Sequence, residues 1–292
     1  MTGTAGFAER RFRAQDGLSL YFRDYGPQDS ADTPVLCLTG LARNSKDFAP
    51  FAARISTQGR RVLCLDYRGR GRSAYDPDPM NYQPPTYLND IRHMLAALGL
   101  HKVIVAGSSL GGILGMAMGA AMPTAIAGLI LNDVGPEIDT AGFARIQNYL
   151  KTDRPHRDWD DAVADLKTIF TNNSFTEEEW RDVADGTFVR RDDGLLHFDW
   201  DVNLYKPIEK SPGIPDLWPY FNSVRHVPIL VLRGEKSDIL VPDTVDRMVE
   251  RHPSIRAVTV PGAGHIPTLK EPESVEAVDD FLGRIAEHRP GH

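Results

Sequence analysis

The chain has 292 residues, of which 41% are hydrophobic and 25% are charged, and its formal net charge at pH 7 is -7. These proportions are those of an ordinary soluble globular protein, long enough to bury a full core as one large α/β domain or two smaller ones. The negative charge, with no Lys/Arg run, argues against nucleic acid and an anionic membrane as partners.

The sequence contains no evident targeting or membrane-spanning segment. The first residues lack the apolar stretch of a secretory signal, and no run of 18 apolar residues occurs anywhere. The two cysteines, Cys37 and Cys64, each lie within an apolar strand-like run. We expect buried, reduced thiols rather than a disulfide, and therefore a cytoplasmic protein.

Strand-like runs and helical patterns follow one another through the first half of the chain. The predicted strands cover residues 10–13, 18–25, 35–38, 61–65, 103–106 and 126–131. The predicted helices cover residues 46–58, 86–98 and 110–122. Apart from a hairpin formed by the first two strands, this alternation predicts a parallel sheet with helices on both faces. Ligands of such sheets bind at the carboxyl ends of the strands.

The alternation stops after residue 136 and resumes near residue 226. Residues 137–225 contain helical patterns at 143–150, 159–170 and 177–183 but no apolar strand run. An insertion of this length is usually functional, so we expect a helical cap over a core formed by residues 1–136 and 226–292. The second part of the core has predicted strands at 227–232 and 255–260 and predicted helices at 243–251 and 272–286.

A Gly-x-Ser-x-Gly pattern spans residues 107–111, with Ser109 at its centre. A buried strand precedes it and a helix of small residues follows it, the context in which a serine hydroxyl is exposed on a sharp turn. The start of a helix also favours a developing negative charge. We therefore expect Ser109 to be a nucleophile.

A serine nucleophile requires a base, and His265 is the best placed of the nine histidines. It lies in a glycine-rich loop directly after a buried strand, at the edge where the sheet presents its ligands. A carboxylate must orient this base. Asp238, a few residues beyond the preceding strand, is the first choice, Asp133 at the end of the sixth strand is the alternative, and Glu235 is a weaker one.

The oxyanion of an acyl-transfer reaction needs two N–H donors. The backbone N–H of Leu110, directly after the nucleophile, is one candidate. The other is the N–H of Leu41, in the loop after the third strand. Gly40 leaves the peptide before Leu41 free to turn inward.

These segments together resemble the α/β-hydrolase fold superfamily, in its capped esterase and carbon–carbon hydrolase branch. The resemblance spans nearly the whole chain and is carried by residues 39–41, 66–73 and 107–112, the Asp238 loop and Gly264-His265. It implies an eight-stranded, mostly parallel sheet with a helical cap after strand 6, and Ser109, Asp238 and His265 as nucleophile, acid and base. Many relatives have His-Gly where this chain has Thr39-Gly40, which leaves the geometry of the second donor open.

The hypothesis that follows is a serine hydrolase that cleaves a carboxylic ester or lactone through an acyl-enzyme, with no cofactor and no metal. Hydrolysis of a carbon–carbon bond in a vinylogous diketone is the alternative within the same class, and perhydrolysis is a lesser one. A ligand sensor with little turnover on the same scaffold is the alternative from a different class. We expect a small ester-like molecule as the partner, and the chain to be a monomer or a homodimer.

Overall fold

The structure is a computed structural model that describes residues 6–139, 143, 147–210, 213 and 215–287. Its strands are β1 (Phe7–Arg13), β2 (Ser19–Tyr25), β3 (Val35–Leu38), β4 (Val62–Leu65), β5 (Val103–Ser108), β6 (Ile126–Asn132), β7 (Phe188–Arg190), β8 (Leu196–Phe198), β9 (Ile229–Gly234) and β10 (Ile255–Val260). Its α-helices are α1 (Ala49–Thr57), α2 (Pro84–Ala97), α3 (Leu110–Ala121), α5 (Trp159–Ile169), α6 (Glu177–Thr187), α7 (Tyr205–Glu209), α8 (Trp218–Ser223), α9 (Pro242–Arg251) and α10 (Pro272–Glu287). Short 3₁₀ helices are η1 (Ser45–Phe48), η2 (Pro79–Asn81), η3 (Pro123–Ala125) and η4 (Val202–Leu204).

Eight strands form one sheet in the order β1-β2-β4-β3-β5-β6-β9-β10. Strand β2 is antiparallel to its neighbours β1 and β4, and the other neighbouring strands of the sheet are parallel. The expected eight-stranded, mostly parallel sheet is confirmed. The carboxyl ends of its parallel strands therefore meet along one edge.

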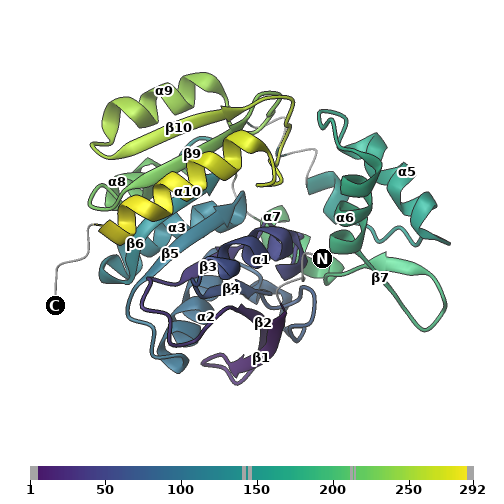
Figure 1. Cartoon of the computed structure of the whole chain (residues 1–292). Helices are drawn as coiled ribbons and strands as arrows, with labels where there is room; N and C mark the ends of the chain where they lie inside the picture. Colours follow the sequence, from purple (N-terminus) through teal and green to yellow (C-terminus); the bar gives the residue numbers. More distant parts are fainter. Residues whose placement is uncertain (1–5, 140–142, 144–146, 211–212, 214, 288–292) are drawn as a thin grey trace.

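Helices cover both faces of this sheet (Figure 1). Because successive side chains of a strand point to opposite faces, β3 contributes to two cores. Leu36 and Leu38 belong to the core packed by α2, α3, α8 and α9, whereas Val35 and Cys37 belong to the core packed by α1 and α10. Cys37 and Cys64 are buried free thiols that face each other in the β3–β4 register, as expected. No helix in the described ranges has the length and apolar character needed to cross a bilayer.

The segment between β6 and β9 projects beyond one end of the sheet as α5, α6 and β7 (Figure 1). Strands β7 and β8 pair as an antiparallel hairpin that the sequence did not predict, because three-residue strands are too short for a periodic pattern. At the other end of the segment, α8 packs against α3. This part of the insertion therefore lies against the body, which is the part of the structure that contains the eight-stranded sheet and its helices. The helix predicted over residues 143–150 includes residues 144–146, which lie outside the described residues, and the division into core and cap stays a prediction.

Candidate active site

Ser109 lies between the last residue of β5 and the first residue of α3, as predicted. Its backbone has φ 50° and ψ −115°, an uncommon conformation that costs about 1–3 kcal/mol and is held by its surroundings. Its glycine neighbours allow the close packing: a Cβ on Gly111 would lie 1.9 Å from the carbonyl oxygen of Leu38, and one on Gly107 would lie 2.4 Å from the carbonyl carbon of Gly111. The glycines of the pattern therefore make the sharp turn possible.

The turn opens into a cavity of about 350 Å³ that is lined by both Ser109 and His265. Residues from the body and from the insertion share the wall, including Leu41, Leu150, Phe170, Val183 and Trp200. The wall is largely apolar, as is typical of a site for a small organic molecule. Within the described residues, no group of three or more His, Cys, Asp or Glu side chains is arranged to hold a metal ion.

His265 is buried, and its Nδ1 lies 2.7 Å from Oδ2 of Asp133. A carboxylate at this distance accepts a hydrogen bond from an Nδ1–H group and leaves Nε2 with its lone pair free to take a proton. Asp133 directly follows β6 and has a positive φ of 55°. The pair thus combines a loop histidine after β10 with a carboxylate at the end of β6.

Two further donors hold the Asp133 carboxylate. The backbone N–H of Gly234 donates to Oδ1 at 2.8 Å, and the hydroxyl of Ser237 donates to Oδ2 at 2.6 Å. The side chain of Asp133 is fully buried, so these donors replace the hydration that a carboxylate would otherwise have. Sequence reasoning missed Ser237, although it lies next to Asp238 in the loop that was singled out.

The carboxylate that lies 2.7 Å from Nδ1 of His265 is that of Asp133, which the sequence offered as the alternative to Asp238. Asp238 lies on a small neighbouring cavity that His265 also borders. The reason is a close crossing at the end of β9, where a Cβ on Gly234 would lie 2.3 Å from the carbonyl oxygen of Gly264. The His265 loop thus passes over the end of β9, the strand beside β10, and reaches the end of β6.

The loop after β3 lies beside Ser109. A Cβ on Gly40 would lie 3.8 Å from Cβ of Ser109. The carbonyl of Gly40 accepts from the backbone N–H of Arg43 at 3.3 Å, so the N–H of Leu41, on the other side of the same trans peptide, points away from Arg43. The side chain of Arg70 fixes the next carbonyl, because its Nε donates to the oxygen of Leu41 at 2.9 Å. Leu110 is the first residue of α3, where helical N–H groups have no partner within the helix.

Asn132 connects the serine turn to the histidine loop. Its side-chain Nδ2 donates to Oγ of Ser108 and to the carbonyl oxygen of Pro267, both at 3.0 Å. Its backbone carbonyl accepts from the backbone N–H of Ser109 at 3.2 Å. The side chain is buried at the wall of the cavity. Its position at the end of β6, next to Asp133, was the available sequence signal.

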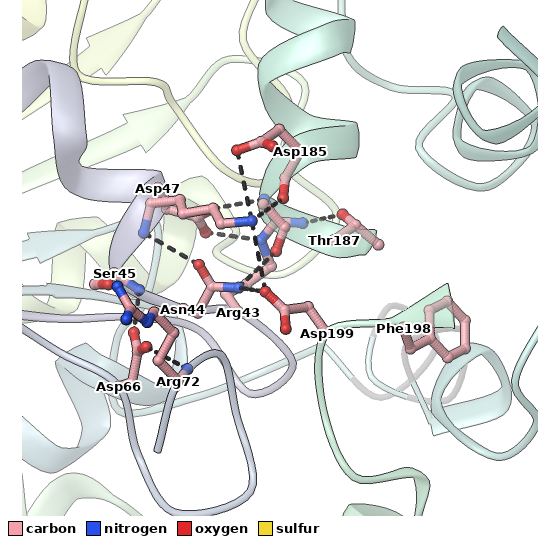
Figure 2. A network of polar contacts seen from close by, with 12 residues as sticks. Arg43, Asn44, Ser45, Asp47, Asp66, Arg72, Asp185, Thr187, Phe198 and Asp199 are labelled. Carbon is pink, nitrogen blue, oxygen red and sulfur yellow. Dashed lines mark hydrogen bonds and ion pairs between the residues drawn. The ribbon is translucent and has the colours of Figure 1, made fainter. Parts of the chain in front are cut away.

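The segment that follows the Gly40–Leu41 loop is bound to the insertion through Arg43 (Figure 2). Its guanidinium makes a two-point contact with Asp47, at 2.7 Å and 2.6 Å, and donates to Thr187 and to the carbonyl of Val183 at the end of α6. The pKa of Arg43 is raised, because the adjacent carboxylate of Asp47 outweighs the desolvation of the charge. Arg43 therefore remains a cation that joins body and insertion.

Asn44 and Asp199 form a second connection in the same network (Figure 2). Nδ2 of Asn44 donates to Oδ2 of Asp199 and to the carbonyl of Gly186, both at 3.0 Å. Burial raises the pKa of Asp199 to about 6, and Lys46, 3.6 Å away, limits the rise. Burial therefore favours the protonated form of the carboxyl at this connection.

Comparisons with known proteins support the fold described above. The sequence profile described as "Alpha/beta hydrolase family" matches residues 35–278. The chain belongs to the alpha/beta hydrolase family. It is 34% identical over 276 residues to a 3-hydroxybutyrate-oligomer hydrolase of Cupriavidus necator, covering 90% of this chain and 92% of that protein. It is 23% identical to a 2-(acetamidomethylene)succinate hydrolase of Mesorhizobium japonicum, covering 85% of this chain and 87% of that one.

A solved structure of an alpha/beta hydrolase from Novosphingobium aromaticivorans is also similar. It superposes with a TM-score of 0.91 at 40% identity, over 97% of this chain and 100% of that one. Together with the sequence relatives it identifies this family member as an enzyme of the hydrolase class. The resemblance to the α/β-hydrolase superfamily stated from the sequence is confirmed.

Proposed function

We propose that this alpha/beta hydrolase cleaves a carboxylic ester through an acyl-enzyme on Ser109. The observation that carries the proposal is the 2.7 Å contact between Nδ1 of His265 and Asp133, on a cavity that Ser109 also lines. Asp133 holds the imidazole in the tautomer whose Nε2 accepts the serine proton. It also stabilises the imidazolium that forms.

In the first half of the reaction, Oγ of Ser109 bonds to the ester carbonyl carbon while His265 takes its proton. The alcohol then leaves with that proton, and the acyl group stays on Ser109. In the second half, water gives a proton to His265 and attacks the acyl carbon. The acid leaves, and the proton returns to Oγ of Ser109.

Two backbone N–H groups, those of Leu41 and Leu110, would bind the oxyanion of each tetrahedral intermediate. The carbonyl contact at Gly40 turns the first of these away from Arg43, and the helix start at Leu110 adds the favourable end of the α3 dipole. Loss of one such donor typically costs about a hundredfold or more in rate. Thr39, buried beneath this loop, donates through Oγ1 to the carbonyl of Arg43 at 3.2 Å, which keeps the loop closed.

The substrate class is a short ester with an apolar acyl group, and an oligoester of a hydroxy acid is the first candidate. The cavity of about 350 Å³ with its largely apolar wall supports a small acyl chain. The 34% identity to a 3-hydroxybutyrate-oligomer hydrolase over most of both chains supports the oligoester. Residues 137–225 would act as the cap, because side chains from this segment complete the wall of the cavity.

The test compares Ser109→Ala with Ser108→Ala, since two serines are adjacent in this turn. Hydrolysis of p-nitrophenyl esters of increasing chain length and of 3-hydroxybutyrate dimers and trimers is measured, together with labelling by a fluorophosphonate probe. We expect Ser109→Ala to lose turnover and labelling while the melting temperature is retained, and Ser108→Ala to be labelled. Turnover by Ser109→Ala would refute the proposal, and preferential cleavage of a vinylogous diketone in the same panel would favour carbon–carbon hydrolysis instead.

A further inference from the structure

One side chain of the insertion contacts the loop that carries His265. Asn173 lies in the segment between α5 and α6, and it is half-buried although its neighbours Asn172 and Ser174 are exposed. Its Oδ1 accepts from the backbone N–H of Gly264 at 3.1 Å, and its Nδ2 donates to the carbonyl oxygen of His265 at 3.5 Å. The amide therefore binds the peptide that precedes Gly264 and the peptide that follows His265, and so spans the two residues.

The backbones also pack closely here. A Cβ on Gly264 would lie 2.7 Å from the carbonyl oxygen of Asn172, so only glycine allows this approach. The N–H of Asn173 donates to the carbonyl of Phe170 at 3.3 Å and closes the turn that presents the amide. The turn that ends at Asn173 therefore packs directly against the histidine loop.

Residues at the end of β6 also bind the histidine loop. Asp133 binds the imidazole, and Nδ2 of Asn132 binds the carbonyl of Pro267 at 3.0 Å. Neither of these contacts involves the N–H of Gly264 or the carbonyl of His265. The insertion binds both of these groups through Asn173.

We propose that Asn173 is a positioning residue, by which the seated cap orients His265 for proton transfer. The inference rests on the proposed function and extends it: the cap completes the proton-transfer geometry as well as enclosing the substrate. Misplacement of a reacting group by about 1 Å can cost about a hundredfold in rate. Loss of Asn173 should therefore lower kcat more than it raises KM.

Two variants of Asn173 separate orientation from charge. Asn173→Ala removes both hydrogen bonds, and we expect kcat to fall about tenfold with KM changed by less than about threefold. Asn173→Asp keeps the acceptor for Gly264 but loses the donor and adds a negative charge. That charge stabilises the protonated imidazole, so the acidic limb of the kcat/KM profile should move to higher pH by roughly 0.5 unit. Among the described charged groups, Asp133 binds Nδ1 of His265, Asp238 borders a small cavity with it, and Glu179, Asp182 and Lys270 line the larger cavity that it also lines.

Ser174→Ala is the matched control. Nζ of Lys236 donates to Oγ of Ser174 at 2.7 Å, so this variant also removes a tie between the same cap segment and the body, but it leaves the histidine loop untouched. We expect its kcat, KM and pH profile to equal those of the unaltered protein. Melting temperatures of all variants verify folding.

Equal kinetics of Asn173→Ala and Ser174→Ala, or an unshifted pH profile in Asn173→Asp, would overturn the inference while leaving the proposed function intact. Absence of ester turnover and of fluorophosphonate labelling in the unaltered protein would instead overturn the proposed function, and this inference with it. The two failures are therefore distinguishable from one set of measurements.

Discussion

Replacing Asp133 by asparagine exchanges one carboxylate oxygen for an NH₂ group. The carboxylate accepts hydrogen bonds from three donors. Gly234 N–H binds Oδ1, while the Ser237 hydroxyl and Nδ1 of His265 bind Oδ2. An amide NH₂ in the Oδ2 position would donate to Nδ1 of His265. The imidazole would then carry its proton on Nε2 and could no longer accept one from Ser109.

The opposite amide orientation would set NH₂ against the N–H of Gly234, two donors in a fully buried place. An unsatisfied buried donor costs about 1–3 kcal/mol, and the charge that stabilises the imidazolium is lost in either orientation. We therefore expect Asp133→Asn to lower kcat by about 10³–10⁴-fold, which corresponds to about 4–5.5 kcal/mol of transition-state stabilisation.

The assay is kcat and kcat/KM on a short p-nitrophenyl ester, with Asp238→Asn as the matched control. Asp238 lies one residue beyond Ser237 and borders a neighbouring cavity, whereas Asp133 lies 2.7 Å from Nδ1 of His265, so substitution of Asp238 should change kcat by less than about threefold. Thermal melts verify that both variants fold. A loss of more than about a hundredfold in Asp238→Asn, with Asp133→Asn close to the unaltered protein, would refute the assignment of the acid.

Three further variants test the surroundings of the site. Ser237→Ala removes the hydroxyl that donates to Asp133 at 2.6 Å. Because a hydrogen bond to a charged group contributes about 1.5–3 kcal/mol, kcat on the same ester should fall about tenfold. An unchanged kcat would contradict this role of Ser237. Gly111→Ala should lower the free energy of unfolding in urea by about 3 kcal/mol or more, because its Cβ would lie 1.9 Å from a carbonyl oxygen. Gly283→Ala in α10 should raise it by about 0.5–1 kcal/mol, because its Cβ meets no atom of the described chain within 4 Å. Equal effects of the two variants would count against the tight-turn argument. Asp199, with a pKa raised to about 6, binds its proton more tightly in the folded than in the unfolded state. Between pH 4 and 7 the unaltered protein should therefore lose roughly 2 kcal/mol of unfolding free energy relative to Asp199→Asn, and parallel pH profiles in urea would exclude this.

The serine turn and the histidine loop could be predicted because local patterns specify both. The Gly-x-Ser-x-Gly pattern lies between an apolar strand and a small-residue helix, and the structure has β5 and α3 at these places. Likewise, His265 follows a strand that the structure gives as β10. Patterns of this kind depend on residues that are neighbours in the sequence, so one sequence is enough to reveal them.

The acid could not be selected in this way. Asp133 and Asp238 each follow a strand, and strand adjacency favoured Asp238 because β9 lies beside β10. The selection depends on a backbone crossing between Gly234 and Gly264, which brings His265 past β9. Such a crossing has no signature beyond the two glycines themselves.

The sequence by itself determined the alternation of strands and helices and the loops that carry Ser109, Leu41 and His265. Hydrophobic periodicity and turn residues suffice for these, because they act over a few neighbouring positions. Only the tertiary structure decided which carboxylate meets His265 and that Asn173 of the insertion touches the histidine loop. Those contacts join residues that are 132 and 91–92 positions apart, so they depend on how whole elements pack rather than on any local pattern.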